Sequence, residues 1–86
     1  MAYIVESTEP FAKEFYKRHK DKWERLERMK EKLKDAPESG KPLSGKLHGL
    51  WQLRIDSFRI WYVIDEKEKK VTLKMILHKS EAKRLY

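Results

Sequence analysis

The feature that most constrains the fold is a change in the spacing of apolar residues near residue 50. From residue 9 to residue 35, apolar side chains recur every three to four positions, as they do on amphipathic helices. From residue 50 to residue 78, apolar and polar side chains alternate, as they do on half-buried strands. A chain of 86 residues builds only one core, so helices and strands must share it. The sequence therefore predicts a single α+β domain over residues 1–86.

The first half of the chain predicts a strand followed by a hairpin of two helices. Residues 2–7 are β-prone, and residues 8–10 then supply a capping threonine, an acidic residue and a first-turn proline. Helical spacing begins at Phe11, and a second capping pattern at residues 21–24 opens a second apolar stripe. Because the break between the two stripes is short, the two helices are expected to pack antiparallel.

The second half predicts three antiparallel strands joined as a meander. Residues 36–49 hold all three glycines and two of the three prolines, so we expect a connector that runs over the surface. Three β-rich runs follow, separated by short polar turns, at residues 50–55, 58–64 and 70–78. Residues 79–86 are expected to form a short helix or a tail. The predicted fold is a mostly antiparallel sheet with the helices on one face.

A two-residue loop at Asp56 and Ser57 fixes the register of the first two runs. It pairs Ile55 with Phe58, Arg54 with Arg59, Leu53 with Ile60, Gln52 with Trp61, and Trp51 with Tyr62. Alternation assigns these side chains to the helix-facing side: Trp51, Leu53, Ile55, Phe58, Ile60, Tyr62 and Ile64, joined by Val71, Leu73, Met75 and Leu77. The opposite face is expected to hold Gln52, Arg54, Arg59 and Trp61, with Thr72, Lys74, Ile76 and His78 from the last strand.

Positive charge is concentrated in the second half of the chain. Residues 1–40 carry ten Lys/Arg and nine Asp/Glu, and residues 41–86 carry eleven and five, so the halves contribute +1 and +6 to the total of +7. A surplus in one half predicts a surface that binds a polyanion. Arg54 and Arg59 lie directly across a strand pair, where like charges repel. Either an anion lies against them, or they extend into solvent or pair with Asp56.

The composition excludes several classes of site. The chain has no cysteine, and His19, His48 and His78 lack zinc-ligand spacing, so no metal or other cofactor is expected. No apolar run is long enough to span a bilayer, and the first residues lack a secretory pattern, which predicts a cytoplasmic protein without membrane contact. His78 is a candidate general base, because imidazole titrates near neutrality. Trp61 is a candidate for stacking on a nucleotide base. Histidine and tryptophan are both more often structural residues than functional ones.

Two segments of the second half resemble the RelE/ParE toxin superfamily. They are Lys46-Leu47-His48-Gly49-Leu50-Trp51-Gln52-Leu53-Arg54 and Phe58-Arg59-Ile60-Trp61-Tyr62, which place two arginines five residues apart. Leu77-His78-Lys79 and Tyr86 fit the end of the family pattern, and the match covers nearly the whole chain. The resemblance implies a toxin that cleaves messenger RNA in the ribosomal A site, by attack of a ribose 2'-hydroxyl on the adjacent phosphodiester.

The resemblance also implies roles for individual residues. Arg59 would stabilise the charge that develops on the phosphate, and His78 and Tyr86 are the other candidate catalytic residues. The candidate RNA-binding residues are Lys46, Gln52, Arg54, Trp61, Lys74, Lys79, Lys83 and Arg84. Two lysines that the family pattern leads us to expect before the catalytic arginine fall on Leu50 and Gln52, so the general base stays unassigned.

The expected partners are messenger RNA, the ribosomal A site and an acidic RelB-like antitoxin that is partly disordered until it binds. The resemblance leaves two other functions open. A ParE-like poison shares the fold but binds DNA gyrase and performs no chemistry of its own. A basic RNA-binding module would bind RNA with a salt-dependent affinity and would not cleave it.

Overall fold

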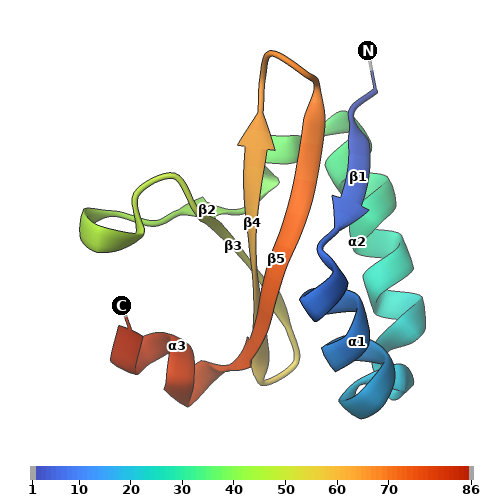
Figure 1. The fold of residues 1–86 in the computed structure, drawn as a ribbon, viewed down its shortest axis with the longest axis vertical. Helices are drawn as coiled ribbons and strands as arrows, with labels where there is room; N and C mark the ends of the chain where they lie inside the picture. Colours follow the sequence, from blue (N-terminus) through green and yellow to red (C-terminus); the bar gives the residue numbers. More distant parts are fainter. Residues whose placement is uncertain (1, 86) are drawn as a thin grey trace.

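In the computed structural model, which describes residues 2–85, a five-stranded sheet separates one pair of helices from a third helix (Figure 1). The elements are β1 (Ile4–Ser7), α1 (Glu9–Arg18), a 3-10 turn (Lys20–Lys22), α2 (Trp23–Asp35), a 3-10 turn (Pro37–Ser39), β2 (Lys41–Pro42), a 3-10 turn (Gly45–Leu47), β3 (Trp51–Ile55), β4 (Phe58–Asp65), β5 (Lys70–His78) and α3 (Lys79–Leu85). The order across the sheet is β1-β5-β4-β3-β2. Only β1 and β5 pair in parallel, so the predicted α+β architecture is confirmed.

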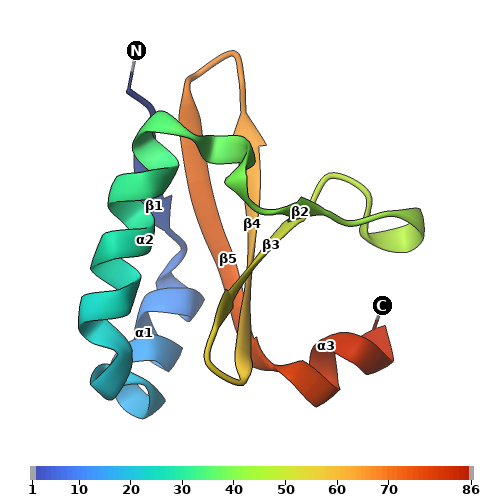
Figure 2. The same ribbon diagram turned by 180° about the vertical axis from the view of Figure 1, so that it is seen from behind.

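Helices α1 and α2 lie together against one face of the sheet, as the sequence predicts (Figure 2). Thr8 caps α1, because its hydroxyl oxygen accepts a hydrogen bond from the backbone N–H of Phe11 at 3.3 Å. Helix α3 and the connector between β2 and β3 lie on the opposite side of the sheet (Figure 1). The short strand β2 falls inside the predicted connector, where Lys41 pairs with Gln52 and Pro42 with Trp51.

The register of β3 and β4 is confirmed at all five pairs, from Trp51 opposite Tyr62 to Ile55 opposite Phe58. The two-residue loop that sets this register places Asp56 at a φ of 52°. Aspartate tolerates this left-handed conformation better than most residues. Arg54 and Arg59 are therefore directly opposite each other, as expected.

A bulge in β5 makes the predicted orientation of its last residues wrong. Trp61 pairs with Met75 but Tyr62 pairs with Leu73, so Lys74 is an extra residue without a partner on β4. One extra residue moves every later side chain to the other face. The faces predicted for residues 75–78 are therefore exchanged. Ile76, rather than Leu77, joins the core that faces α1 and α2, and Leu77 lies on the opposite face.

The sheet consequently has an apolar cluster on each face. The main core, between the sheet and α1 and α2, is built on these fully buried side chains: Phe11, Phe15, Leu26, Leu33, Ile60, Tyr62, Val71 and Leu73. The second cluster, on the opposite face, contains Leu43, Trp61, Leu77 and Ala82. Its members come from the connector, two strands and α3, so it fastens the connector and α3 to the sheet.

Tyr62 ties the segment before β2 to the main core. Its hydroxyl group donates a hydrogen bond to the Pro37 carbonyl at 2.8 Å and accepts one from the Gly40 N–H at 3.1 Å. Burial raises the pKa of Tyr62, so the hydroxyl group keeps its proton at neutral pH. A Cβ atom on Gly40 would lie 2.5 Å from the Tyr62 hydroxyl oxygen, which explains why glycine occupies this close approach.

We expect Tyr62→Phe to lower the free energy of unfolding by about 1–3 kcal/mol, because it leaves the buried Pro37 carbonyl and the partly buried Gly40 N–H without their partner. Urea unfolding of the purified protein measures this loss. Tyr16→Phe is the matched control, since Tyr16 is 54% exposed and the same change there should cost less than about 0.5 kcal/mol. Equal effects of the two changes would contradict the anchoring role of Tyr62.

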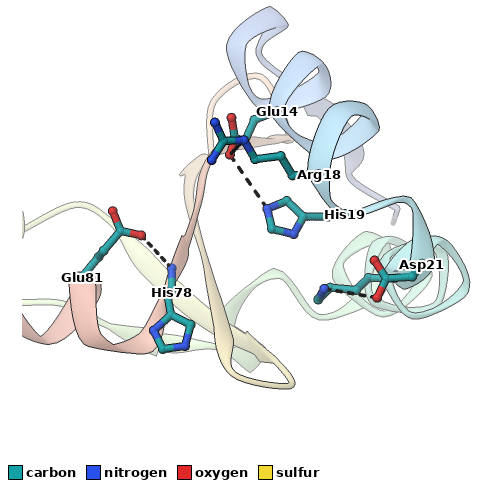
Figure 3. Close-up of polar contacts among 7 residues, drawn as sticks. Glu14, Arg18, His19, Asp21, His78 and Glu81 are labelled. Carbon is teal, nitrogen blue, oxygen red and sulfur yellow. Dashed lines mark hydrogen bonds and ion pairs between the residues drawn. The ribbon is translucent and has the colours of Figure 1, made fainter.

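His19 is buried at the end of α1 although it is polar (Figure 3). Its ring contacts Phe58 with centroids 4.6 Å apart, and its Nδ1 atom has no hydrogen-bond partner among the described residues. Burial lowers the pKa of His19, with a further decrease from Lys22, and the Glu14 carboxylate opposes these effects. The folded protein therefore holds a neutral imidazole at this position.

In the unfolded chain His19 has the ordinary histidine pKa of about 6.5, which is higher than its pKa in the folded protein. Below neutrality the unfolded state therefore binds more protons than the folded state. The contribution of His19 to stability is therefore fully present above about pH 7 and is lost as the pH falls through 6.5 toward the lower folded pKa. Urea midpoints measured between about pH 5 and pH 7.5 should fall less steeply for His19→Leu than for the parent protein. His48→Leu, at an exposed loop position, should keep the parent slope.

Candidate nucleic-acid interface

Five cationic side chains surround a groove of about 750 Å³ on the face of the sheet opposite α1 and α2. They are Lys41 of β2, Arg54 of β3, Arg59 of β4, and Lys79 and Lys83 of α3. The remaining lining side chains among residues 2–85 are Gln52, Ser80 and Ala82, and none of these is acidic. Concentrated positive charge without carboxylates attracts polyanions, and we refer to this surface as the cationic groove.

The second apolar cluster brings the walls of the cationic groove together. Ala82 of α3 and Leu43 of the connector pack against Trp61 and Leu77 on the sheet. The backbone N–H of Lys79 also donates to the Ser57 carbonyl at 2.8 Å, which fixes the start of α3 at the β3–β4 loop. Lysines far apart in the sequence thus reach the same surface as the arginine pair.

The two arginines of the groove have no carboxylate partner among residues 2–85. The guanidinium group of Arg59 donates to the main-chain carbonyls of Phe58, at 3.1 Å, and Asp56, at 3.4 Å. The Asp56 carboxylate forms its ion pair with Arg25 of α2 instead. The alternative in which Asp56 neutralises the arginine pair is therefore wrong, and an external anion remains the natural partner of Arg54 and Arg59.

Gln52 and Trp61 lie on the predicted face, but only Gln52 reaches the groove. The Trp61 ring is 2% exposed, so the expectation that it stacks on a nucleotide base is wrong. Its indole N–H donates to the Gln52 side-chain oxygen at 2.9 Å. This bond orients the Gln52 amide with its oxygen occupied, which leaves the NH₂ group as the donor available to the groove.

His78 does not share a face with Arg59, contrary to the prediction. It pairs with Phe58 across the strands, and its ring meets the Phe58 ring edge-on with centroids 5.3 Å apart. The bulge at Lys74 accounts for the reversal. His78 instead caps α3, because its Nδ1 atom accepts a hydrogen bond from the Ser80 N–H at 3.2 Å. Its own backbone N–H donates to the Glu81 carboxylate at 3.2 Å (Figure 3).

The cap also engages one ring nitrogen of His78. Nδ1 lies 3.2 Å from the Ser80 backbone nitrogen and 2.9 Å from the Ser80 hydroxyl oxygen. The position of His78, on the face of the sheet away from Arg59, argues against the general base that the sequence suggested.

The other predicted residues are distributed unevenly. Lys79 and Lys83 line the groove with Arg54 and Arg59, as the sequence predicts for one basic surface. Other predicted RNA-binding residues are exposed but do not line it: Lys46, Lys74 and Arg84. Lys74 sits at the bulge and lines a separate hollow beside α1. Tyr86 lies outside the described residues.

Sequence reasoning missed Lys41, which lines the cationic groove from β2. It pairs with Gln52 across the β2–β3 ladder. The two-residue strand lies within a glycine- and proline-containing connector, where no alternating pattern can develop. Lysine and proline are nevertheless common on exposed edge strands, where they prevent pairing with other chains. The Lys41-Pro42 pair was therefore the one feature of the sequence that could have indicated an edge strand here.

The groove has the donors for binding phosphate but not the ligands for holding a metal. Within residues 2–85, no cluster of three or more His, Asp or Glu side chains is arranged around a possible ion position. The same residues include no helix that is long and apolar enough to cross a lipid bilayer. Guanidinium and ammonium groups instead bind phosphate oxygens through charge-assisted hydrogen bonds.

Comparison with known proteins identifies a family. The family model described as "ParE toxin of type II toxin-antitoxin system, parDE" matches residues 1–83. No curated protein sequence matches the chain significantly.

Several solved structures are similar in fold, and three of them illustrate the match. The RelBE2 toxin-antitoxin complex of Mycobacterium tuberculosis has a TM-score of 0.80 at 24% identity, covering 91% of this chain and 99% of that chain. A free mutant of the Escherichia coli toxin RelE gives 0.77 at 23% identity, with coverages of 100% and 92%. The archaeal RelE-RelB complex of Pyrococcus horikoshii gives 0.74 at 19% identity, with coverages of 92% and 97%. At these identities the likeness shows a shared fold.

The capping role of His78 predicts how α3 responds to substitution. We expect His78→Ala to destabilise α3 by about 0.5–2 kcal/mol, because the Ser80 N–H loses its acceptor. His78→Asn should retain most of the stability, since asparagine is a preferred capping residue. Amide hydrogen exchange over residues 79–85 measures the difference. Equal losses in the two variants would contradict the cap.

Proposed function

Since the chain belongs to the ParE toxin family of type II toxin-antitoxin systems, we propose that it acts as a RelE-like, ribosome-dependent endoribonuclease. Its substrate is messenger RNA in the ribosomal A site, and its effect is to stop translation. The observation that carries the proposal is the cationic groove, in which Arg54 and Arg59 lie opposite each other without a carboxylate partner among the described residues. A phosphodiester backbone supplies the missing negative charge.

The proposed reaction is attack of a ribose 2'-hydroxyl on the adjacent phosphorus, which releases the 5'-oxygen and leaves a cyclic phosphate. Arg59 binds the scissile phosphate and stabilises the charge that develops on it in the transition state. Its two bonds to main-chain carbonyls are weak enough to be exchanged for bonds to phosphate oxygens. No metal or other cofactor takes part in this chemistry.

The other cations of the groove bind the flanking phosphates. Arg54, Lys79 and Lys83 contact them directly, and the NH₂ group of Gln52 adds a neutral donor. The more distant cations extend the RNA path by long-range attraction: Lys46, Lys74 and Arg84. Tyr86 stacks on or orients a nucleotide, as the family pattern implies. The proton of the 2'-hydroxyl passes to water, because His78 faces away from Arg59, and a cationic groove lysine donates the proton that the leaving 5'-oxygen takes up.

The proposed partner is a RelB-like antitoxin whose acidic segment is disordered until it binds. Proteins of similar fold are seen in the RelBE2 toxin-antitoxin complex of M. tuberculosis and in the RelE-RelB complex of P. horikoshii. The proposed place of action is the cytoplasm, where ribosomes and messenger RNA are found.

One observation favours a second function. The matching family model is that of ParE. The resemblance of the sequence to this family implies, as the alternative, a toxin that poisons DNA gyrase and performs no chemistry of its own. The cationic groove supports the ribonuclease over the gyrase poison, because a protein that only binds gyrase has no need for two arginines without a carboxylate partner among the described residues. Purified ribosomes with a defined message, and purified gyrase with a supercoiled plasmid, test the two functions separately.

We expect Arg59→Ala to reduce A-site cleavage by about 10²–10³-fold, because a cation aimed at developing charge contributes most in the transition state. Primer extension on message incubated with ribosomes measures the rate. Arg18→Ala is the matched control, since Arg18 is exposed on α1 and does not line the groove. Full cleavage by a folded Arg59→Ala variant would exclude the proposed role, and gyrase inhibition without cleavage would favour the second function.

We expect His78→Asn to cleave message at close to the parental rate and with an unchanged pH profile, because asparagine preserves the cap but cannot accept a proton. The same ribosome assay, run across pH, measures both quantities. A loss of about a hundredfold or more, together with native amide exchange in α3, would return the general base to His78.

A further inference from the structure

The chain contains one side-chain amide, and it lies in the cationic groove. Gln52 is the only glutamine of the sequence, which has no asparagine. Its described neighbours in the lining are the five cations, together with Ser80 and Ala82. An amide differs from all of these side chains because it carries both an acceptor oxygen and an NH₂ donor. A freely rotating amide would offer either group to a ligand.

Trp61 removes this choice from Gln52. The indole N–H can only donate, and it lies 2.9 Å from the Gln52 side-chain oxygen. Because the Trp61 ring is buried, water cannot take the place of this acceptor. Turning the amide over would bring its NH₂ group against the indole N–H and leave a buried donor without a partner, which is costly. The oxygen therefore stays with Trp61, and the NH₂ group points away from it.

The sheet holds both partners of this hydrogen bond in place. Gln52 pairs with Trp61 on one side and with Lys41 on the other, so its position in the ladder is fixed. The Trp61 ring packs with Leu77 and Ala82 in the second apolar cluster. The NH₂ donor thus has a set direction before any ligand arrives, and a side chain locked by its supporting contacts discriminates between ligands better than a mobile one.

Gln52 lies next to the arginine pair on the same face of the sheet. Arg54 is two residues further along β3, and Arg59 precedes Trp61 by two residues on β4. Side chains with this spacing are about 6–7 Å apart along a strand. That separation is close to the reach from a phosphate group to the base of the same nucleotide. A nucleotide with its phosphate on the arginines therefore brings its base to Gln52.

The four bases differ in what they offer to a donor of fixed direction. Guanine and uracil carry a keto oxygen where adenine and cytosine carry an amino group. The keto oxygen accepts a hydrogen bond from an NH₂ group, whereas an amino group opposes it with another N–H. The surrounding cations form the stronger bonds to phosphate, because their hydrogen bonds are charge-assisted. The neutral donor is therefore left for the base.

We propose that Gln52 is a specificity residue that selects the keto bases, guanine and uracil, for the nucleotide beside the arginine pair. Trp61 is its positioning residue, since the indole N–H decides which end of the amide meets the base. The inference rests on the proposed function only in taking RNA to be the ligand of the cationic groove. It adds which bases the groove accepts at one position.

The experiment measures the binding of two RNA hexamers, one of uridine and one of cytidine, by fluorescence anisotropy. The two bases share a ring and differ chiefly in the keto or amino group. A methyl group on every 2'-oxygen prevents cleavage by the proposed reaction. We expect the parent protein to bind the uridine hexamer about tenfold more tightly than the cytidine hexamer. Hexamers of inosine and adenosine, whose purines differ in the same way, should show the same preference for the keto base.

Exchange of the amide for a carboxylate should reverse the preference. In Gln52→Glu one oxygen accepts the Trp61 N–H, and the other presents an acceptor that suits the amino group of cytosine. We therefore expect this variant to bind the cytidine hexamer more tightly than the uridine hexamer. Gln52→Met is similar in length but has neither donor nor strong acceptor, and it should bind the two hexamers within about twofold of each other.

Trp61→Phe tests the positioning residue while Gln52 stays intact. It keeps an aromatic ring but removes the indole N–H, so the amide can turn either end to the base. We expect the preference for uridine to fall to about twofold or less. Thermal unfolding of each variant verifies that it is folded. The substitutions at Gln52, which is only half-buried, keep the test decisive if Trp61→Phe is unstable.

The matched control is Lys67→Gln, which makes the same change in net charge as Gln52→Glu at an exposed position outside the groove. A change in overall charge acts on every RNA alike. Lys67→Gln should therefore weaken the binding of both hexamers equally and keep the parental ratio between them.

Any of four results would overturn the inference: no binding of either hexamer, equal binding of the two by the parent protein, a parental preference for the amino bases, or a parental ratio in Gln52→Glu. The assay contains no ribosome and its RNA cannot be cleaved, so it is independent of ribonuclease activity. A protein that prefers keto bases but does not cleave message on the ribosome would refute the proposed function and leave the role of Gln52 supported. Cleavage of message as expected, with equal binding of the two hexamers, would refute only the role of Gln52.

Discussion

The structure depends on one inserted residue in β5, because the bulge at Lys74 lets a small sheet build an apolar cluster on each face. Before the bulge, Val71 and Leu73 point toward the helices. After it, Ile76 continues that core while Leu77 joins the cluster on the other side. Without the bulge, Leu77 would face α1 and α2, and Ile76 would be the apolar residue of β5 on the face that carries the arginines, one position further from the start of α3.

The second cluster makes the candidate site possible. Lys79 and Lys83 reach the arginine pair only because Ala82 packs against Trp61 and Leu77. The helix is seven residues long and would be marginal by itself, so packing and the His78 cap must hold it in place. Trp61 serves this apolar purpose rather than stacking on a base, and its indole N–H orients Gln52 at the edge of the groove.

Sequence reasoning predicted what depends on local rules and missed what depends on tertiary contact. The loop at residues 56–57 fixed five strand pairs, and these placed Arg54 opposite Arg59. The bulge could not be predicted in the same way, because residues 75–77 are all apolar and fit either face. His78 was misplaced for that reason alone. Lys41 was missed because a two-residue strand carries no periodicity, and its pairing with Gln52 exists only in the folded sheet.

The arginine pair shows how function constrains the charges around it. Like charges directly across a strand pair destabilise a sheet, and a neighbouring aspartate would relieve them. The nearest acidic residue in the loop, Asp56, turns away to form an ion pair with Arg25 on α2. The domain thus uses its available carboxylate to join the hairpin to the helices, and leaves the repulsion between Arg54 and Arg59 to be relieved from outside. Any anion that binds beside the two arginines relieves this repulsion, so the pair that destabilises the unbound sheet favours the bound anion.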